Sequence, residues 1–281
     1  MRIVNLIENT EGRAGCAFAH GLSFYVETKK HRLLLDLGPS EETLKNADRL
    51  GIDLSAVDTV ILSHGHYDHA GGILAFAKRN ARAAIYMQAS AAGEYYANDG
   101  PDAPARYRYI GIDKGIAALP QTRRLRGDYV LDEETELFTV KERRRELPFT
   151  NRRLLVRGED GYWPDDFSHE QFLVLREKGK MVLMSGCAHN GILNILEAFR
   201  GKYGKAPELV VSGFHLLKKS PYREEELREI EEIAKKLTEY PTRFITCHCT
   251  GEEAYRRMKS VMGRQLEYVH SGEGVMITKR Q

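Results

Sequence analysis

Four side chains that can bind metal ions lie within six residues, directly after a short apolar segment. The segment is 57–62, and the candidate ligands are His64, His66, Asp68 and His69. Two histidines separated by one residue cannot share a face of an α-helix, but they project to the same side of an extended chain. The cluster is therefore expected at the tip of a buried strand, where a sheet ends and a tight turn begins.

The spacing within the cluster favours two groups of ligands rather than one. Gly65 permits a tight turn directly after the strand. Because adjacent side chains diverge, Asp68 and His69 are expected to face a position beside the one that His64 and His66 face. This arrangement predicts two divalent transition-metal ions. Imidazole and carboxylate ligands in this mixture favour zinc, and they also suit iron or manganese.

The bulk composition predicts a globular enzyme. The chain has 281 residues, of which 42% are hydrophobic, and this is enough for a substantial core. Its net charge of +2 argues against a dedicated nucleic-acid binder, which would carry a strong basic excess. The four cysteines contain no Cys-x-x-Cys pair and indicate no disulfide framework. With no signal peptide and no long apolar stretch, the chain is expected to be cytoplasmic and to have no membrane partner.

Strand-like and helix-like segments alternate along most of the chain, which predicts an α/β fold. A Tyr-, Arg-, Gly- and Pro-rich segment, about 98–166, interrupts the pattern. It is interpreted as an insertion over the active site, so that 1–281 form one domain. Ser40 is placed as a helix N-cap, and Thr250 with Glu253 has the spacing of a capping box. The expected strands are 2–7, 22–27, 32–36, 57–62, 83–87, 171–176, 181–185, 208–212, 243–247 and 273–278, and the expected helices are 41–50, 73–80, 191–200, 223–238 and 251–262.

The order His-x-His-x-Asp-His after an apolar strand resembles the motif of the metallo-β-lactamase superfamily, and residues 64–69 match it in full. Asp36, in the segment Leu-Leu-Leu-Asp-Leu-Gly, is similar to the aspartate of the superfamily's Asp-x-Gly strand end. In the superfamily this aspartate orients a ligand histidine. The resemblance covers most of the chain outside the insertion. It implies an αβ/βα sandwich of the metallo-β-lactamase fold, with the metal ions at one edge.

Two metal ions need further ligands, and three later histidines follow apolar strands. His248, in Cys-His-Cys-Thr-Gly, is similar to the last ligand of the superfamily. His189 lies in Ser-Gly-Cys-Ala-His, and His215 lies in Ser-Gly-Phe-His. These motifs resemble the branch related to an archaeal dihydropterin-ribosylaminobenzene phosphate synthase. Asn9 and the stretch 19–23 resemble the start of that branch.

The chain departs from the superfamily at one place. Cys187 lies where a bridging aspartate is usual, and it is either a bridging thiolate or a small buried residue. The same alignment would make His169 the usual third histidine. His189 is favoured instead, because its glycine-flanked strand tip recurs at the other two candidates, but the sequence leaves His169 open. The predicted metal ligands are therefore His64, His66, Asp68, His69, His189 and His248, the predicted catalytic residues are Asp68 and His215, and His20, His31 and His270 are interpreted as ordinary.

A site of this composition favours hydrolysis. A hydroxide that bridges the metal ions would attack an ester, amide or phosphodiester, while Asp68 holds its hydrogen and His215 protonates the leaving group. The substrate is expected to be an anionic, phosphate-containing small molecule. Its charge could be matched by arginines of the insertion, with Tyr107 and Tyr109 stacked on a flat ring, although such a charged run is more often a solvated face. These arginines are Arg106, Arg108, Arg143, Arg144, Arg145, Arg152 and Arg153.

The resemblance to the pterin synthase implies an alternative function. A transferase of this kind would join a dihydropterin diphosphate to an aryl-amine ribose phosphate. A di-iron redox protein of the same fold is disfavoured, because that branch has a glutamate at the position of His66 and is usually tied to a flavin domain. The ligand set is too complete for a non-catalytic module, and the charge does not fit a nuclease. The sequence does not indicate an oligomeric state.

Overall fold

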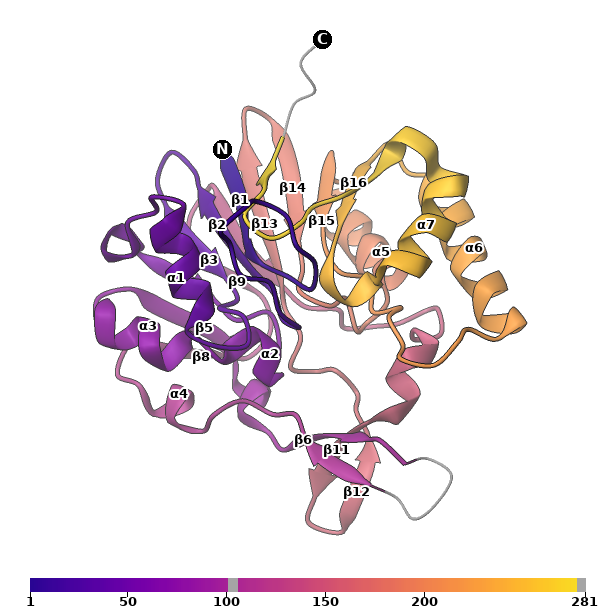
Figure 1. Ribbon diagram of the computed structural model, residues 1–281, viewed down its shortest axis with the longest axis horizontal. Helices are drawn as coiled ribbons and strands as arrows, with labels where there is room; N and C mark the ends of the chain where they lie inside the picture. The colour runs from indigo at the N-terminus through magenta and orange to yellow at the C-terminus, as the bar shows by residue number, and fades with distance from the viewer. Residues whose placement is uncertain (101–105, 277–281) are drawn as a thin grey trace.

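The computed structural model describes residues 1–100 and 106–276. Two seven-stranded sheets pack face to face, and helices cover the outer side of each sheet (Figure 1). The order of layers is helix, sheet, sheet, helix. This confirms the predicted αβ/βα sandwich.

The first sheet belongs mainly to the N-terminal half, and α1 (Glu42–Arg49) and α3 (Ile73–Arg79) cover it. Its central strands run parallel from β3 to β8, whereas β1, β2 and β3 are joined as antiparallel neighbours. In spatial order the strands are β18 (Gly274–Val275), β1 (Arg2–Ile7), β2 (Ser23–Glu27), β3 (Arg32–Leu35), β4 (Thr59–Ile61), β5 (Ala84–Gln88) and β8 (Thr122–Leu125).

The second sheet belongs mainly to the C-terminal half, and α5 (Ile192–Tyr203), α6 (Glu224–Thr238) and α7 (Glu252–Met262) cover it. Strands β14 to β17 run parallel, while β13 pairs antiparallel with β14 and with β10. In spatial order the strands are β17 (Leu266–Tyr268), β16 (Arg243–Thr246), β15 (Leu209–Val211), β14 (Lys180–Met184), β13 (Phe172–Glu177), β10 (Thr135–Phe138) and β9 (Tyr129–Val130).

Alternating side chains explain why the sheets stack with helices outside. On β2, Phe24 and Val26 lie in the apolar cluster between the sheets, whereas Tyr25 faces the layer of α1 and α3. On β14, Val182 lies between the sheets and Leu183 packs against the C-terminal helices. A strand that is apolar on both faces must be covered on both, so each sheet is buried between its partner and its helices.

In both main sheets, the candidate functional residues follow the carboxyl ends of the parallel strands. β4 ends just before the histidine cluster, which continues into the one-turn helix α2 (Tyr67–Ala70). β14, β15 and β16 end just before the segments that contain His189, His215 and His248. Parallel neighbours place their carboxyl ends at one edge of a sheet, so the sequence-distant motifs meet there.

Residues 98–166, predicted as an insertion, contribute to all three sheets of the described structure. β8 extends the first sheet, and β9 and β10 extend the second. The remaining strands form a small four-stranded sheet, seen at the bottom of Figure 1 below α2, and the segment after its strand β7 pairs with His66. We propose that residues 1–281 form a single domain. The strands of the small sheet are β6 (Tyr95–Asn98), β7 (Tyr107–Tyr109), β11 (Leu154–Gly158) and β12 (Gly161–Pro164).

The predicted strands and helices are present, with ends that differ mostly by one to three residues. The last predicted strand, 273–278, is found as β18, and its last two residues lie outside the described part. Both cap predictions were wrong. The N-cap of α1 is Glu41, while the Ser40 hydroxyl accepts from the Glu42 N–H at 3.3 Å. The N-cap of α7 is Gly251, because the Thr250 hydroxyl accepts from the Phe214 N–H at 2.8 Å.

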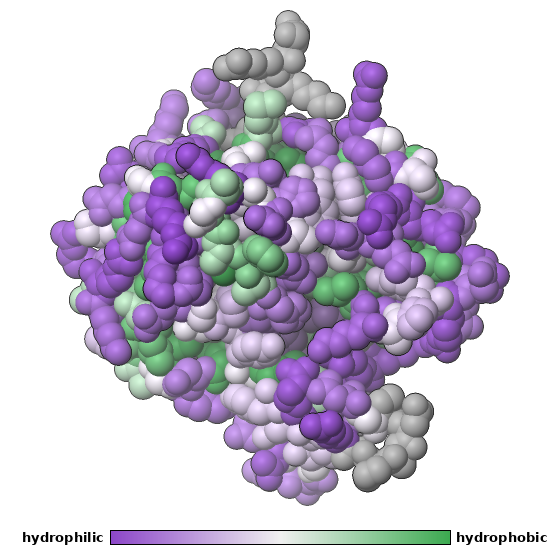
Figure 2. All heavy atoms as spheres, in the orientation of Figure 1, coloured by the Kyte–Doolittle hydropathy of each residue, from purple (hydrophilic) through white to green (hydrophobic). Residues whose placement is uncertain are grey.

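The surface in Figure 2 is mainly hydrophilic, and its apolar residues occupy small separate areas. Among the described residues, no helix has both the length and the apolar character that crossing a membrane requires.

Candidate metal centre

The histidine cluster occupies the turn after β4, and Asp36 at the end of β3 fixes its start. The Asp36 carboxylate accepts the Ser63 N–H and the Ser63 hydroxyl, each at 2.7 Å. Gly65 is packed so closely that a Cβ there would lie 2.5 Å from the Ala91 carbonyl oxygen. The turn is therefore tight enough to aim His64 and His66 toward the same space, as their spacing predicts.

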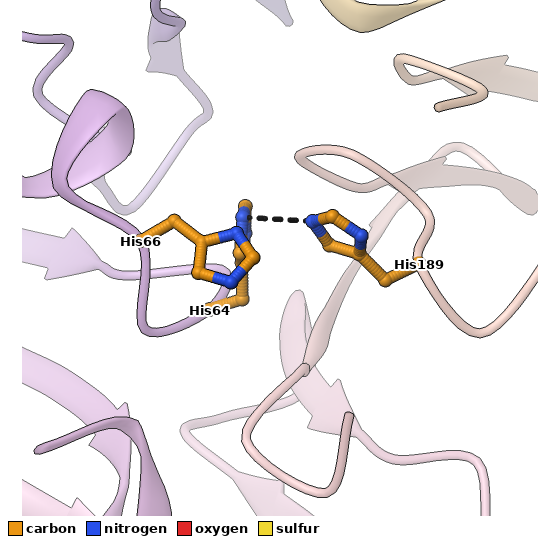
Figure 3. A group of neighbouring side chains, drawn as sticks. All are labelled: His64, His66 and His189. Carbon is orange, nitrogen blue, oxygen red and sulfur yellow. Dashed lines mark hydrogen bonds between the residues drawn. The ribbon is translucent and has the colours of Figure 1, made fainter. Parts of the chain in front are cut away.

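His64, His66 and His189 form the first ligand group. One ligand atom from each lies within 4.8 Å of the others, and all three residues are buried. In Figure 3 His64 and His66 come from the turn after β4, and His189 meets them from the opposite segment after β14. The Nε2 atoms of His64 and His189 are 3.3 Å apart. The structure thus brings together three residues predicted as ligands from two distant parts of the sequence.

The hydrogen bonds made by Nδ1 of His64 and of His189 place the ring proton on Nδ1. The Nε2 atom of each ring therefore carries a free lone pair. The Ser63 hydroxyl gives its proton to Asp36, so it must accept from Nδ1–H of His64 at 2.8 Å. The Asn151 amide donates to the His189 carbonyl at 2.7 Å, so its oxygen accepts from Nδ1–H of His189 at 2.9 Å. Two nitrogen lone pairs therefore face each other with no proton between them, and a cation would satisfy both.

Asp68, His69 and His248 form the second ligand group, with a fourth residue beside them. Oδ2 of Asp68 lies 3.6 Å from Nε2 of His69 and 3.4 Å from Nε2 of His248. The fourth residue is His20, whose Nε2 lies 3.5 Å from the same carboxylate oxygen. His20 was interpreted as ordinary from the sequence. The structure corrects this, because its ring lies among potential ligand atoms at the edge of the site.

The two histidines of the second group also have a fixed ring orientation. Nδ1 of His69 donates to Asp36 at 2.7 Å, so the expected contact of Asp36 with a ligand histidine is confirmed. Nδ1 of His248 donates to the Asn9 amide oxygen at 2.7 Å. Nε2 of His248 is buried and, within residues 1–100 and 106–276, has no hydrogen-bond partner. A buried polar atom left in this state is costly unless something binds it.

The spacing of the ligand atoms fits metal ions. Nitrogen and oxygen ligands bind zinc at about 2.0–2.1 Å in tetrahedral sites, which sets neighbouring ligand atoms about 3.3–3.4 Å apart. The separation between His64 and His189 is 3.3 Å, and that between Asp68 and His248 is 3.4 Å. Nε2 of His66 is a further buried atom without a partner in the described chain. The residues present therefore fit two divalent ions.

His169, the alternative third histidine, is placed differently. Its Nδ1 accepts the Gly65 N–H at 2.9 Å, and its Nε2 lies 3.1 Å from the Asp165 carboxylate. Both ring nitrogens are therefore engaged in holding the turn. This geometry favours His189 over His169 as a ligand.

Burial and neighbouring charges separate the two groups electrostatically. Burial, followed by the neighbouring histidines, holds the pKa of His64 and His189 well below the usual range, and the pKa of His66 falls to about 3. For His69 burial acts in the same direction, but Asp36 and Asp68 outweigh it and raise the pKa to about 9. Burial would raise the pKa of Asp68, yet His69 and His248 hold it well below its usual range.

Two buried glutamates and two asparagines hold His189 and His248 in matching ways. Glu170 accepts the backbone N–H of His189 at 2.7 Å, and Glu8 accepts that of His248 at 2.9 Å. The asparagine that contacts each ring also donates to the carbonyl of the same histidine, at 2.7 Å for His189 and at 3.4 Å for His248. These supports were missed from the sequence, except that Asn9 was noted as part of a motif.

Four residues at this edge have a left-handed backbone although none is glycine. Asp36, Ala188, His215 and His248 have φ between 48° and 61°. Each follows the end of a strand of one of the two main sheets. Such residues are strained by about 1–3 kcal/mol, and they tend to cluster at functional sites. His215 brings its ring to 4.1 Å from that of His189, and its buried Nδ1 has no partner among the described residues.

The arginines and tyrosines proposed for substrate binding are largely engaged with protein groups. Arg108 and Arg153 both pair with Asp99, at 2.7 and 2.8 Å. Tyr107 stacks on Tyr162 with ring centroids 4.0 Å apart. These contacts favour the alternative in which the charged run is a solvated face of the small sheet.

The chain is similar to known proteins in sequence and in structure. A family model described as "Metallo-beta-lactamase superfamily" matches residues 18–151. An uncharacterised protein of Methanocaldococcus jannaschii is 26% identical over 273 residues, which cover 95% of this chain and 97% of the relative. The 7,8-dihydropterin-6-methyl-4-(beta-D-ribofuranosyl)-aminobenzene-5'-phosphate synthase of the same organism is 27% identical over 274 residues, 90% of this chain and 88% of the relative.

A similar solved structure is that of Tm1679, named as a metal-dependent hydrolase of the beta-lactamase superfamily. It superposes with a TM-score of 0.82 and is 30% identical in sequence. The match covers 99% of this chain and 100% of that one.

Proposed function

Because this chain belongs to the metallo-β-lactamase superfamily, we propose that it is a metal-dependent hydrolase of an anionic, phosphate-containing small molecule. The observation that carries the proposal is the pair of facing Nε2 lone pairs of His64 and His189, next to a second group of ligand atoms with similar spacing. The relative Tm1679, named as a metal-dependent hydrolase, gives independent support. The proposed ligands are His64, His66 and His189 at the first position and Asp68, His69 and His248 at the second.

The charge of the ligand set supports an anionic substrate. The predicted ligands include five imidazoles but only one carboxylate, that of Asp68. Two divalent ions in such a set keep an excess of positive charge, and a partly buried site strengthens its attraction for an anion. Since Arg108 and Arg153 are already paired with Asp99, we assign this role to the metal centre itself.

Two side chains of the site, those of Asp68 and His215, are placed to handle protons. When bound, the ions would polarise the scissile bond and lower the pKa of a water molecule. Asp68 would accept a hydrogen bond from the attacking water through its carboxylate. The unpartnered Nδ1 of His215 lies next to the first group, where it would donate a proton to the leaving group.

An assay on the metal-loaded protein tests this function. The wild type should release product from a chromogenic phosphodiester or ester with metal and water alone. Asp68→Asn keeps the size of the side chain but removes its charge, and it should lower the rate on the order of 10³-fold. His31→Gln, in which the changed side chain contacts Asp58 and Asp132 away from the site, should remain active. Equal turnover by wild type and Asp68→Asn would assign the activity to a contaminant.

A transferase is the second candidate, and the relationship to the pterin synthase favours it. A dihydropterin diphosphate would lose diphosphate as an aryl-amine ribose phosphate attacks in place of water. Such an enzyme must keep water from the activated centre until its second substrate has bound. The small sheet beside the site is the part of the chain that could provide this exclusion.

The same preparation separates the two candidates. A transferase should be nearly inactive on the chromogenic ester, yet it should consume the pterin diphosphate once the aryl-amine partner is added. A hydrolase should show no dependence on that partner. Turnover of the ester at full rate without the partner would exclude the transferase.

A further inference from the structure

Two cysteines lie inside the metal centre together with the histidines and Asp68. Sγ of Cys187 is 3.2 Å from Nε2 of His69, a ligand of the second position. The same sulfur also belongs to a group with His189, a ligand of the first position, in which all ligand atoms lie within 4.8 Å of one another. Cys187 therefore lies between the two positions, close to ligand atoms of both.

Cys249 enters the centre from the segment after β16. Its sulfur forms a group with Cys187 and His248, again with all ligand atoms within 4.8 Å. Sγ of Cys249 accepts the backbone N–H of His215 at 3.3 Å, a contact that stabilises the thiolate form. The adjoining segment leaves room for this sulfur only because residue 213 is glycine, where a Cβ would lie 2.4 Å from it.

The other two cysteines, Cys247 and Cys16, lie in different surroundings from Cys187 and Cys249. Cys247 lies two residues before Cys249, but its side chain belongs to the apolar cluster between the sheets. Cys16 lies in a loop beside Gly272. Cys187 and Cys249 are not members of any apolar cluster found in the described residues, although both are buried. They face imidazoles instead of apolar side chains.

Nε2 of His248 is a further sign that this corner binds a cation. It is buried without a hydrogen-bond partner among the described residues, it lies 3.4 Å from the Asp68 carboxylate, and His248 belongs to the group that contains both sulfurs. We propose that Cys187 and Cys249 bind metal as thiolates, Cys187 between the two positions and Cys249 beside His248, so that the centre selects thiophilic ions such as Zn²⁺, Co²⁺ or Cd²⁺ over Mn²⁺ and Mg²⁺.

The chemistry of this step requires no oxidant or reductant. Each S–H proton passes to solvent as the sulfur lone pair binds the ion. Thiolate ligands favour soft and borderline ions, whereas a bridging carboxylate suits manganese and magnesium. Two thiolates and Asp68 bring three negative charges against four positive ones, so an attraction for an anionic substrate remains. The proposal rests on the proposed function, because it assumes that the centre holds metal ions.

Cobalt substitution tests the proposal without measuring turnover. The full chain is freed of metal with a chelator and titrated with Co²⁺, and thiolate binding is read from the sulfur-to-cobalt charge-transfer absorption in the near ultraviolet. The wild type should show this band as two ions bind. Cys187→Ser should lose most of it, Cys249→Ser should lose a smaller part, and the double variant should lose all of it. Cys16→Ser and Cys247→Ala should keep the full band.

The outcomes separate this proposal from the proposed function. Two bound Co²⁺ ions with an unchanged band in the double variant would overturn thiolate binding and leave the hydrolase proposal standing. A wild type that binds no Co²⁺ would overturn both. If the serine variants fail to fold, as judged by circular dichroism, Cys187→Asp supplies a carboxylate of similar length. It should still bind two ions, and its Zn²⁺/Mn²⁺ affinity ratio should fall by about tenfold or more. An unchanged ratio would overturn the proposal.

Discussion

The two proposed metal positions are built from similar side chains but differ in charge and exposure. The first position has three buried imidazoles, from His64, His66 and His189, and no carboxylate among them. The second contains Asp68 and opens toward His20, whose side chain is 57% exposed. Apart from the Cys187 thiolate proposed between them, the same strand-end architecture thus provides one enclosed position of neutral imidazoles and one position that has a carboxylate and lies next to solvent. We expect the first to hold its ion as a fixed part of the site, and the second to meet the substrate.

The largest effect should come from emptying one position at a time. His66→Ala removes a ligand of the first position only, and Asp68→Asn removes the charge of the second only. Each variant should bind one ion per chain instead of two, and each should lose activity on the order of 10³-fold, because both ions act on one substrate. Elemental analysis of protein purified in metal-replete medium measures this. Loss of both ions in His66→Ala would show that the positions are not separable.

Acid and base should destabilise the metal-free protein through different positions. The lowered pKa values of His64, His66 and His189 mean that the unfolded chain binds more protons below pH 6.5. The free energy of unfolding of the metal-free protein therefore falls as the pH drops below 6.5, because the histidines of the first position bind protons more readily in the unfolded chain. The pKa of His69 is raised to about 9, so its contribution is complete below pH 6.5 and is lost as the pH rises through about 9. The shift corresponds to about 3 kcal/mol.

Urea unfolding of the chelator-treated protein at a series of pH values measures both effects. Asp36→Asn is the matched variant, because it keeps an oxygen acceptor for Nδ1 of His69 but removes the larger of the two charges that raise its pKa. Because Asp68 remains, this variant should show a smaller decline between pH 7 and 9, and it should keep the decline below 6.5. A wild-type stability that rises from pH 7 to 9 would contradict the assignment of His69.

The fold and much of the site could be predicted from the sequence because the relevant signals are local. Alternating strand-like and helix-like segments predicted an α/β fold, and the resemblance carried by residues 64–69 implied the sandwich. Each predicted ligand lies shortly after an apolar strand. Parallel strands that end at one edge then bring these motifs together without further information. The spacing of His64, His66, Asp68 and His69 was sufficient to predict two adjacent groups, and the described structure has that arrangement.

The remaining parts of the site depend on contacts between residues far apart in the chain. Asn9 and His248 are 239 residues apart in sequence, and Glu8 and His248 are 240 apart. No pattern around Glu8 marks a buried carboxylate that holds a histidine on the other sheet. Thr250 shows the opposite error, because a local capping pattern is overridden when its hydroxyl binds the N–H of Phe214 in the neighbouring segment. Local signals compete with tertiary contacts, and only the fold decides between them.

The smallest effect should come from His20, the residue that the sequence did not single out. Its Nε2 is as close to Asp68 as the nitrogens of the buried histidines, but its exposed ring must be ordered at an entropic cost before it can bind. His20→Ala should therefore weaken the second ion by only about two- to tenfold and leave the first unchanged. Competition with a chromogenic chelator measures both affinities, with His31→Ala as a control histidine outside the site. A loss as large as that of Asp68→Asn would make His20 a principal ligand, and the second position would then be closed to substrate instead of open.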